Sequence, residues 1–467
     1  MNELLKQDAA TVGTLLEKVK QTGVQYLEQI NERSTNAQQS VVINGSLQAT
    51  GAGAEATLQE FYQRFEPLMV AAGGPRYWGF VTGGATPAAI AGDWLTTIYD
   101  QNSFAVKGQG DISANIELET IRLLLDLLGL PDDFLGGFVT GATMSNFTCL
   151  AVARQWIGQQ TGKDIAREGL QGPIPVLAAT PHSSAIKSLS LLGIGSSHII
   201  DVQTESGNRE SIQIADLEKQ IEALQGQPFI LVSSGGTVNT VDFDDFVAIA
   251  ALKKKHHFWW HIDAAFGGFA ACSNTHKHLL QGWEDADSIT VDCHKWLNVP
   301  YESAVFLVKD RHRLLQVGTF QNSNAPYLGD PLENFSFMNF LPENSRRLKA
   351  LPAWFTLKAY GKNGYKDIVE NCIALAQQLG AYIASSSHFE LLAPVRLNTV
   401  CFALKDVATD NDTAAFLHEL NSTGKVFMTA TVYKGQKGIR AAIVNWRSTA
   451  ADVELVISLM KQQAAKR

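Results

Sequence analysis

Residues 258–268 read FWWHIDAAFGG, and residues 287–297, a little further along the chain, read DSITVDCHKWL. In each stretch a run of apolar and β-branched residues leads to a charged side chain, Asp263 in the first and Lys295 in the second. Such runs indicate buried strands of a mostly parallel sheet. Because open α/β sheets bind ligands at the carboxyl edge, where strand ends meet, the two stretches predict an α/β fold with a site at that edge.

The segments around these two stretches alternate between strand-like and helical patterns. GGFVTG, PVLAAT, HIIDV and FILVSS are strand-like runs, and helical patterns separate them. Strands that alternate with crossover helices predict one large α/β domain, to which we assign residues 74–345. Beyond it we expect a small α+β domain over residues 346–467. It begins with a long helix interrupted at Gly361 and Gly364, continues with the strands LNTVCFAL and GIRAAIVNW, and ends with a helix that starts at Ser448 and Thr449.

The first 73 residues predict a helical arm. Apolar residues from Val12 to Val19 recur at the spacing of one helix face, and we expect Gly23 to end that helix before a second one over residues 24–30. A helical arm of this kind cannot bury its apolar stripe by itself. The stripe therefore needs a surface outside the arm to cover it.

The composition limits the classes of function. The chain has 467 residues, of which 45% are hydrophobic and 18% charged, so a disordered or fibrous protein is excluded. Its net charge of −8 argues against a nucleic-acid partner. No apolar run reaches the roughly 18–20 residues that span a bilayer. Five scattered cysteines form neither a disulfide framework nor, with the histidines, a metal-ligand spacing, and they favour a reducing, cytoplasmic location.

Lys295 and Asp263 together match the needs of one cofactor. A lysine among apolar residues either extends its amine to water or is desolvated and becomes a nucleophile. An aspartate after a strand either caps the next turn or pairs with a cation. Pyridoxal phosphate (PLP) requires one lysine for a Schiff base and one acid for its pyridinium nitrogen. The pair therefore predicts PLP as the cofactor.

Three further segments meet the remaining needs of PLP. The small residues 140–143 precede a helical pattern whose first amides can bind the phosphate. His182 follows PVLAAT and can stack on the cofactor ring, although a histidine there can equally cap a helix. Thr237, in the turn SSGGTVNTVDFDD, has a similar ambiguity. All these residues stand at strand ends of the same domain, and together they support the PLP interpretation.

With these residues in place, the chain resembles the group II PLP-dependent amino-acid decarboxylases, which act on aromatic amino acids, histidine, glutamate and diaminobutyrate. The resemblance runs through RYWGFVTGGATPAAIAGDWL (76–95), HIDAAFGG and DSITVDCHKWL to GIRAAIVNWRST (438–449). It implies fold type I, decarboxylation of an L-amino acid to an amine and CO2, and a homodimer with shared active sites in which the N-terminal arm clasps the partner.

The resemblance also implies a role for each site residue. Lys295 forms the Schiff base, Asp263 partners the ring nitrogen, Ala265 lies beneath the ring and His182 stacks on it. The phosphate ligands are Ala142, Thr143 and His294, and Thr237 lies on the side of the 3-hydroxyl. Phe80, Val81 and Thr82 line the pocket for the substrate's side chain, and a loop near Lys107 reaches in from the other subunit.

One segment departs from the family pattern. In many relatives a loop after the lysine carries a tyrosine that protonates Cα, and here that position falls on or near Phe337, whereas the tyrosine of this stretch is Tyr327. The acid is therefore Tyr327 or another group, or the chemistry ends in oxidative deamination to an aldehyde. A catalytically idle PLP-binding scaffold is a third interpretation, against which the presence of both Lys295 and Asp263 argues.

Overall fold

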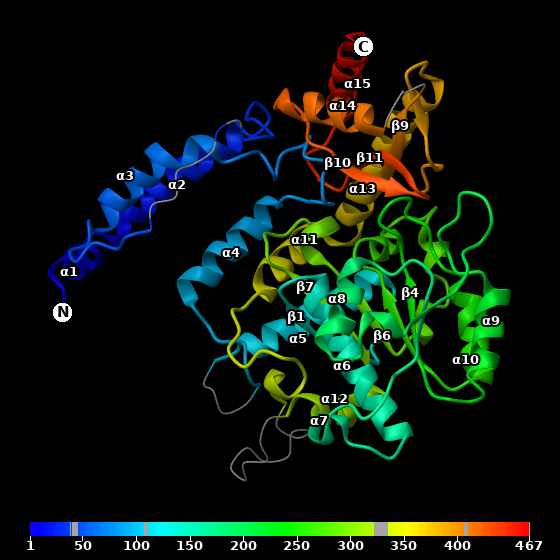
Figure 1. Ribbon diagram of the computed structural model, residues 1–467. Helices are drawn as coiled ribbons and strands as arrows, with labels where there is room; N and C mark the ends of the chain where they lie inside the picture. Colours follow the sequence, from blue (N-terminus) through cyan, green and yellow to red (C-terminus); the bar gives the residue numbers. More distant parts are fainter. Residues whose placement is uncertain (38, 40–44, 107–110, 322–334, 406–409, 467) are drawn as a thin grey trace.

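The computed structural model describes residues 1–467 except 38, 40–44, 107–110, 322–334, 406–409 and 467 (Figure 1). Its central sheet has seven strands in the order β1-β7-β6-β5-β4-β2-β3. Strands β6, β5, β4, β2 and β3 run parallel, and β7 is antiparallel to β1 and β6. This mostly parallel sheet confirms the predicted α/β class. The strands are β1 (Phe134–Val139), β2 (Val176–Ala178), β3 (Ile199–Asp201), β4 (Ile230–Ser234), β5 (Trp259–Asp263), β6 (Ser288–Val291) and β7 (Ala304–Lys309).

Helices cover both faces of the sheet, so its strands are apolar on both sides. In β7, Phe306 and Val308 pack into one core, whereas Val305 and Leu307 pack into the other, as the two-residue period of a strand requires. The first core includes α6 (Ala142–Gln160) and α8 (Ser183–Leu191). The second includes α5 (Ser113–Leu128), α9 (Ile214–Ala223) and α10 (Phe246–Lys255). Shorter helices are α7 (Ile165–Glu168), α11 (Cys293–Trp296) and α12 (Arg313–Phe320).

A second sheet is antiparallel and has the order β10-β11-β9-β8. The long helix α13 leads to it and has a non-helical backbone at Gly361 (φ 58°), so the predicted interruption falls there and not at Gly364. The last helix starts where predicted, and its N-cap Thr449 forms a reciprocal hydrogen-bond pair with Asp452. The elements are α13 (Ala350–Ser385), β8 (Phe389–Leu391), β9 (Thr399–Leu404), α14 (Asp410–Ser422), β10 (Thr429–Tyr433), β11 (Gln436–Ala442) and α15 (Ala450–Ala464).

The N-terminal arm consists of α1 (Glu3–Ala10), α2 (Val12–Glu28) and α3 (Ala54–Arg64), and it extends away from the rest of the chain (Figure 1). The predicted helix end at Gly23 is wrong, because α2 continues through this residue to Glu28. A glycine inside a helix costs only about 1 kcal/mol relative to alanine, which is too little to end a helix without a left-handed turn or a proline. Helix α4 (Pro87–Tyr99) follows and packs against α13.

Short 3-10 turns connect several of these elements: Glu66–Leu68, Ser196–His198, Gly267–Cys272, Lys277–Leu280, Trp283–Asp285, Asp310–His312 and Phe337–Asn339. Helix α13 contacts α4 and α5 beside the large sheet and also β8 and β9 of the small one. The domain boundaries at residues 73/74 and 345/346 stay predictions. Within the described part of the chain, no helix combines the length and the apolar character needed to cross a membrane.

Candidate active site

A cavity of about 740 Å³ opens at the carboxyl ends of β4, β5 and β6. This volume lies in the range of roughly 300–1,000 Å³ that is usual for small-molecule sites. The structure brings to this one cavity the predicted residues Phe80, Ala142, Thr143, His182, Thr237, Asp263, Ala265, His294 and Lys295. Their roles towards a cofactor remain predictions, but their common location is a feature of the fold.

Lys295 lies in the short helix α11, directly after β6. Its Nζ is 3.3 Å from Oδ2 of Asp292, and Oδ1 of the same carboxylate is 3.0 Å from Nδ1 of His294. The backbone of the lysine is tightly packed, because a Cβ on Gly83 would lie 1.6 Å from the Lys295 carbonyl oxygen. Only glycine permits this approach, so the segment that carries Phe80 is fixed against the lysine.

Asp263 is the last residue of β5 and is 8% exposed. Its Oδ2 accepts a hydrogen bond from Nδ2 of Asn146 (2.9 Å), and its Oδ1 accepts one from the backbone N–H of Ala265 (3.2 Å). Behind Asn146 lies His261, whose pKa burial lowers to about 4, so its ring is neutral. Asn146 must turn its amide hydrogens to Asp263, and its oxygen then accepts from Nε2 of His261.

His182 is the N-cap of α8 as well as a wall of the cavity, so both sequence interpretations hold for its position. Burial lowers the pKa of its imidazole. Its Nδ1 accepts the backbone N–H of Ser184 (3.2 Å) and lies 2.7 Å from the Ser184 hydroxyl. A neutral imidazole that accepts at Nδ1 carries its proton on Nε2. The helix cap therefore sets the tautomer of a residue in the cavity wall.

The N-terminus of α6 provides donors for an anion. Its N-cap is Gly141, and no side chain caps the first turn, so the first backbone N–H groups are left without a side-chain partner. Ala142 and Thr143 of this turn line the cavity together with His294. A helix of 19 residues with an uncapped start is suited to bind a phosphate. An amine, a carboxylate and an anion site at one sheet edge together fit PLP.

The cavity also contains charged residues that the sequence did not indicate. Glu210 and Arg440 both line it. Thr237 does not stand alone, because its hydroxyl donates to Oε2 of Glu210 (2.5 Å). Arg440 donates from Nη1 to the Val238 carbonyl (3.3 Å), and its buried Nε has no partner among the described residues. The charge of Arg440 in the otherwise apolar run GIRAAIVNW was the available signal.

The predicted substrate residues differ in their position: Phe80 lines the cavity, whereas Thr82 does not. Phe80 lines the cavity and is 61% exposed, and both Phe80 and Val81 adopt left-handed backbone angles (φ 56° and 60°). Such angles are costly for bulky side chains and tend to occur at functional sites. Thr82 is buried, and its hydroxyl lies 3.3 Å from the Tyr301 hydroxyl instead of lining the cavity. Its substrate-binding role stays a prediction.

The protonating acid is the least defined part of the site. Tyr327 and Lys107 lie outside the described residues. Phe337 is fully buried, with the Arg346 guanidinium 4.5 Å from its ring centre, and it does not line the cavity of its own chain. The correspondence of Phe337 to the family's tyrosine position stays a prediction. The ring fills the core beside Gly137, which has no side chain to occupy that space.

The fold and this cavity define a PLP-dependent enzyme with an α/β core. Residues 39–405 match the model of the pyridoxal-dependent decarboxylase conserved domain. The chain therefore belongs to the pyridoxal-dependent decarboxylase family, as the sequence motifs predicted. Pyridoxal 5′-phosphate is its cofactor, and its reaction is the decarboxylation of an amino acid, so the idle-scaffold interpretation is set aside.

Individual relatives agree with this assignment. The chain is 29% identical over 404 residues to an aromatic-L-amino-acid decarboxylase of Bacillus atrophaeus, which covers 84% of this chain and 81% of the relative. It is 26% identical to tyrosine decarboxylase 2 of Narcissus pseudonarcissus, covering 83% and 80%. The crystal structure of Oryza sativa TDC with PLP and tryptamine has the same fold, with a TM-score of 0.89, 22% identity and 98% coverage of both chains.

Proposed function

We propose that this decarboxylase acts on an aromatic L-amino acid and releases the corresponding amine. The observation that carries the proposal is the exposed ring of Phe80 at the cavity. The ring of Phe80 lies 5.8 Å from that of Phe427, which in turn stacks on Tyr77 at 4.7 Å with an angle of 11° between the planes. Of these three rings, Phe80 lines the cavity with Phe427 behind it, and its apolar face suits an aromatic side chain. The names of the aromatic-L-amino-acid and tyrosine decarboxylases among the relatives support the same substrate class.

The proposed roles follow from the positions of the side chains. Lys295 holds the cofactor covalently, with Asp292 beside its amine. Asp263, oriented by Asn146, keeps the proton on the ring nitrogen. When bound, PLP supplies an electron-accepting ring into which the bond to the substrate carboxylate can break. Ala142, Thr143 and His294 hold its phosphate, Ala265 lies beneath the ring, and Thr237 lies beside it.

The chain must also deliver a proton to Cα. His182 carries a proton on Nε2 and lines the cavity, and Tyr327 belongs to the loop that supplies this proton in many relatives. The relatives named as aromatic-L-amino-acid and tyrosine decarboxylases support an amine product. We therefore infer that the product is the amine.

A panel of L-amino acids tests the proposal. CO2, amine and hydrogen peroxide are measured together for tryptophan, tyrosine, phenylalanine, glutamate and lysine. We expect equal amounts of amine and CO2 from an aromatic acid and no peroxide. Turnover of the acidic or basic acids alone would contradict the substrate class, and peroxide with an aldehyde would contradict the amine product.

We infer further that the protein is a cytoplasmic homodimer. None of the residues of α1, α2 and α3 is buried, and Val12, Leu16 and Val19 expose their side chains along α2. Covering this apolar stripe requires another surface, and a second copy provides it. The five cysteines are free, which agrees with a reducing compartment.

A further inference from the structure

Glu210 is a charged side chain in the cavity to which the proposed roles give no task. It lies in the segment between β3 and α9 and is 8% exposed. Its backbone is held on both sides, because its N–H donates to Oδ2 of Asp242 (2.7 Å) and its carbonyl accepts the hydroxyl of Thr180 (2.7 Å). The position of the side chain is therefore set by the fold.

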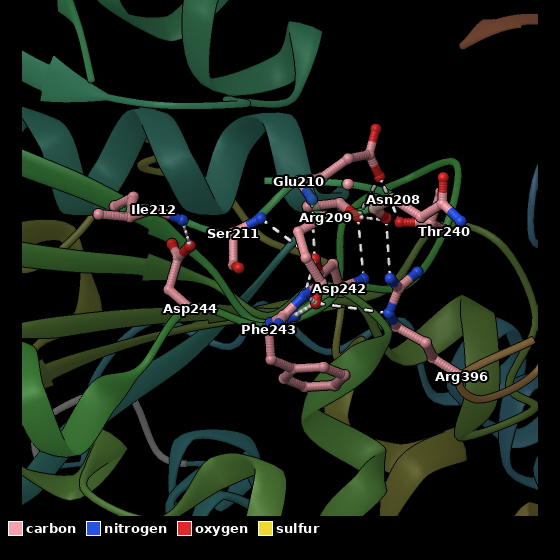
Figure 2. Close-up of polar contacts among 12 residues, drawn as sticks. Asn208, Arg209, Glu210, Ser211, Ile212, Thr240, Asp242, Phe243, Asp244 and Arg396 are labelled. Carbon is pink, nitrogen blue, oxygen red and sulfur yellow. Dashed lines mark hydrogen bonds and ion pairs between the residues drawn. The ribbon is translucent and has the colours of Figure 1, made fainter. Parts of the chain in front are cut away.

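Two buried carboxylates fix the segment that carries Glu210 (Figure 2). Asp242 also accepts the backbone N–H of Ser211 (3.2 Å), and Asp244 accepts that of Ile212 (2.6 Å). Arg209, at 2.8 Å, neutralises Asp242. Main-chain donors and charge pairs thus bind this segment to residues 242–244 and leave it little freedom to move Glu210 out of the cavity.

Among the described residues, hydrogen-bond donors reach one oxygen of the Glu210 carboxylate, Oε2. The hydroxyls of Thr237 and Thr240 both donate to Oε2, at 2.5 and 2.6 Å. Oε1 receives no hydrogen bond from the part of the chain that the structure describes, and among those residues Glu210 forms no ion pair. A buried carboxylate accepts several hydrogen bonds when its surroundings allow it, so Oε1 is an open acceptor at the cavity wall.

We propose that Glu210 determines substrate specificity: Oε1 accepts a hydrogen bond from a donor on the substrate's side chain. The preferred substrates are then aromatic amino acids with a phenol O–H or an indole N–H, and a ring of similar shape without a donor is disfavoured. This inference rests on the proposed function, since it places an aromatic amino acid in the cavity.

The physical reason is the cost of covering an acceptor without pairing it. A substrate ring that lacks a donor removes water from Oε1 and gives no hydrogen bond in return. Sites built to bind a substrate hydroxyl therefore discriminate strongly against the analogue that lacks it. Tyrosine and phenylalanine differ by this one group, and they form the matched pair for the test.

The experiment compares kcat/KM for tyrosine and phenylalanine in the holoenzyme and in Glu210→Gln. We expect the wild type to prefer tyrosine at least tenfold. In Glu210→Gln the amide oxygen still accepts from Thr237 and Thr240, and an NH2 group replaces the open acceptor, so the preference should fall below threefold. Glu205→Gln removes a charge from the same segment outside the cavity and should keep the wild-type ratio.

A binding measurement separates this inference from the proposed function. Tyramine and phenethylamine are titrated into both holoenzymes by calorimetry. We expect tyramine to bind the wild type more tightly and this difference to disappear in Glu210→Gln. If no aromatic acid releases CO2, the proposed function fails, and the amine pair still decides the role of Glu210. Equal binding of the two amines by the wild type, or an equal loss for both in the variant, would overturn it.

Discussion

At the residue scale, the site depends on how Asp263 is held. The carboxylate is buried at the end of β5 and receives one side-chain donor, Asn146, and one backbone donor, Ala265. Its proposed task, keeping a proton on the ring nitrogen, matters most when electrons move into the ring. Removing the charge should therefore affect the chemical step far more than the binding of the substrate.

We expect Asp263→Asn to lower kcat by about 10²-fold or more and to leave KM within a few-fold of the wild type. Asn146→Leu removes one donor to the same carboxylate, and its loss should be smaller, about 10–100-fold. Steady-state kinetics measure both effects. Thr148→Val is the control on α6, because among the described residues its hydroxyl bonds only to the Met144 carbonyl of its own helix. A near-normal kcat in Asp263→Asn would show that this aspartate is merely structural.

The sequence identifies some of these residues and not others, and the reason is physical. Asp263, Lys295 and His182 stand out because each follows an apolar strand, where a polar group needs an explanation. Glu210 lies in the polar stretch TESGNRESIQ, where a further charged residue does not indicate a functional site. Its position in the cavity depends on the long-range pairing with Asp242 and Asp244, which no local pattern shows.

At the scale of elements, the strongly apolar strands were predictable and the weakly patterned parts were not. FILVSS and FWWHID became β4 and β5, because a strand buried on both faces leaves a continuous apolar run. Strand β10 of the small sheet is partly exposed and mixes apolar with polar residues, so its sequence does not predict a strand. The antiparallel direction of β7 also depends on tertiary pairing with β1 and β6. The predicted helix end at Gly23 is wrong, because a glycine alone costs a helix too little to end it.

The continuous course of α2 makes a prediction about stability. We expect Gly23→Ala to raise the free energy of unfolding by about 0.4–1 kcal/mol, since alanine favours the helix and restricts the unfolded chain. A Cβ at this position would lie 3.8 Å from the Trp94 ring, an ordinary contact. Urea denaturation measures the change. Gly129→Ala is the contrasting variant, because Gly129 ends α5 at φ 67° and its substitution should destabilise. Destabilisation by Gly23→Ala would mean that α2 ends there after all.

At the scale of the whole molecule, the part of the chain that the structure describes leaves the apolar stripe of the arm exposed. Val12, Leu16 and Val19 are 39–50% exposed. Contacts to the rest of the chain begin in the last turns of α2, where the Tyr26 hydroxyl donates to the Val70 carbonyl (2.9 Å). Ile30 is buried, and the Asn31 carbonyl accepts a hydrogen bond from the Arg76 guanidinium. A deletion that ends at Glu28 therefore removes α1 and α2 with their apolar stripe and keeps the contacts of Ile30 and Asn31.

We expect deletion of residues 1–28 to convert the proposed dimer into a monomer or an aggregate and to weaken retention of PLP. In the proposed dimer the second copy covers the apolar stripe, and the family resemblance implies active sites between subunits. Light scattering gives the mass of the full and shortened chains, and absorbance after gel filtration gives the retained cofactor. Replacing exposed Lys6 and Lys20 by alanine is the control, since it alters the charge of the same helices and keeps their apolar stripe. A shortened chain that stays a dimer would assign the interface to other surfaces, and an active full-length monomer would contradict the shared site.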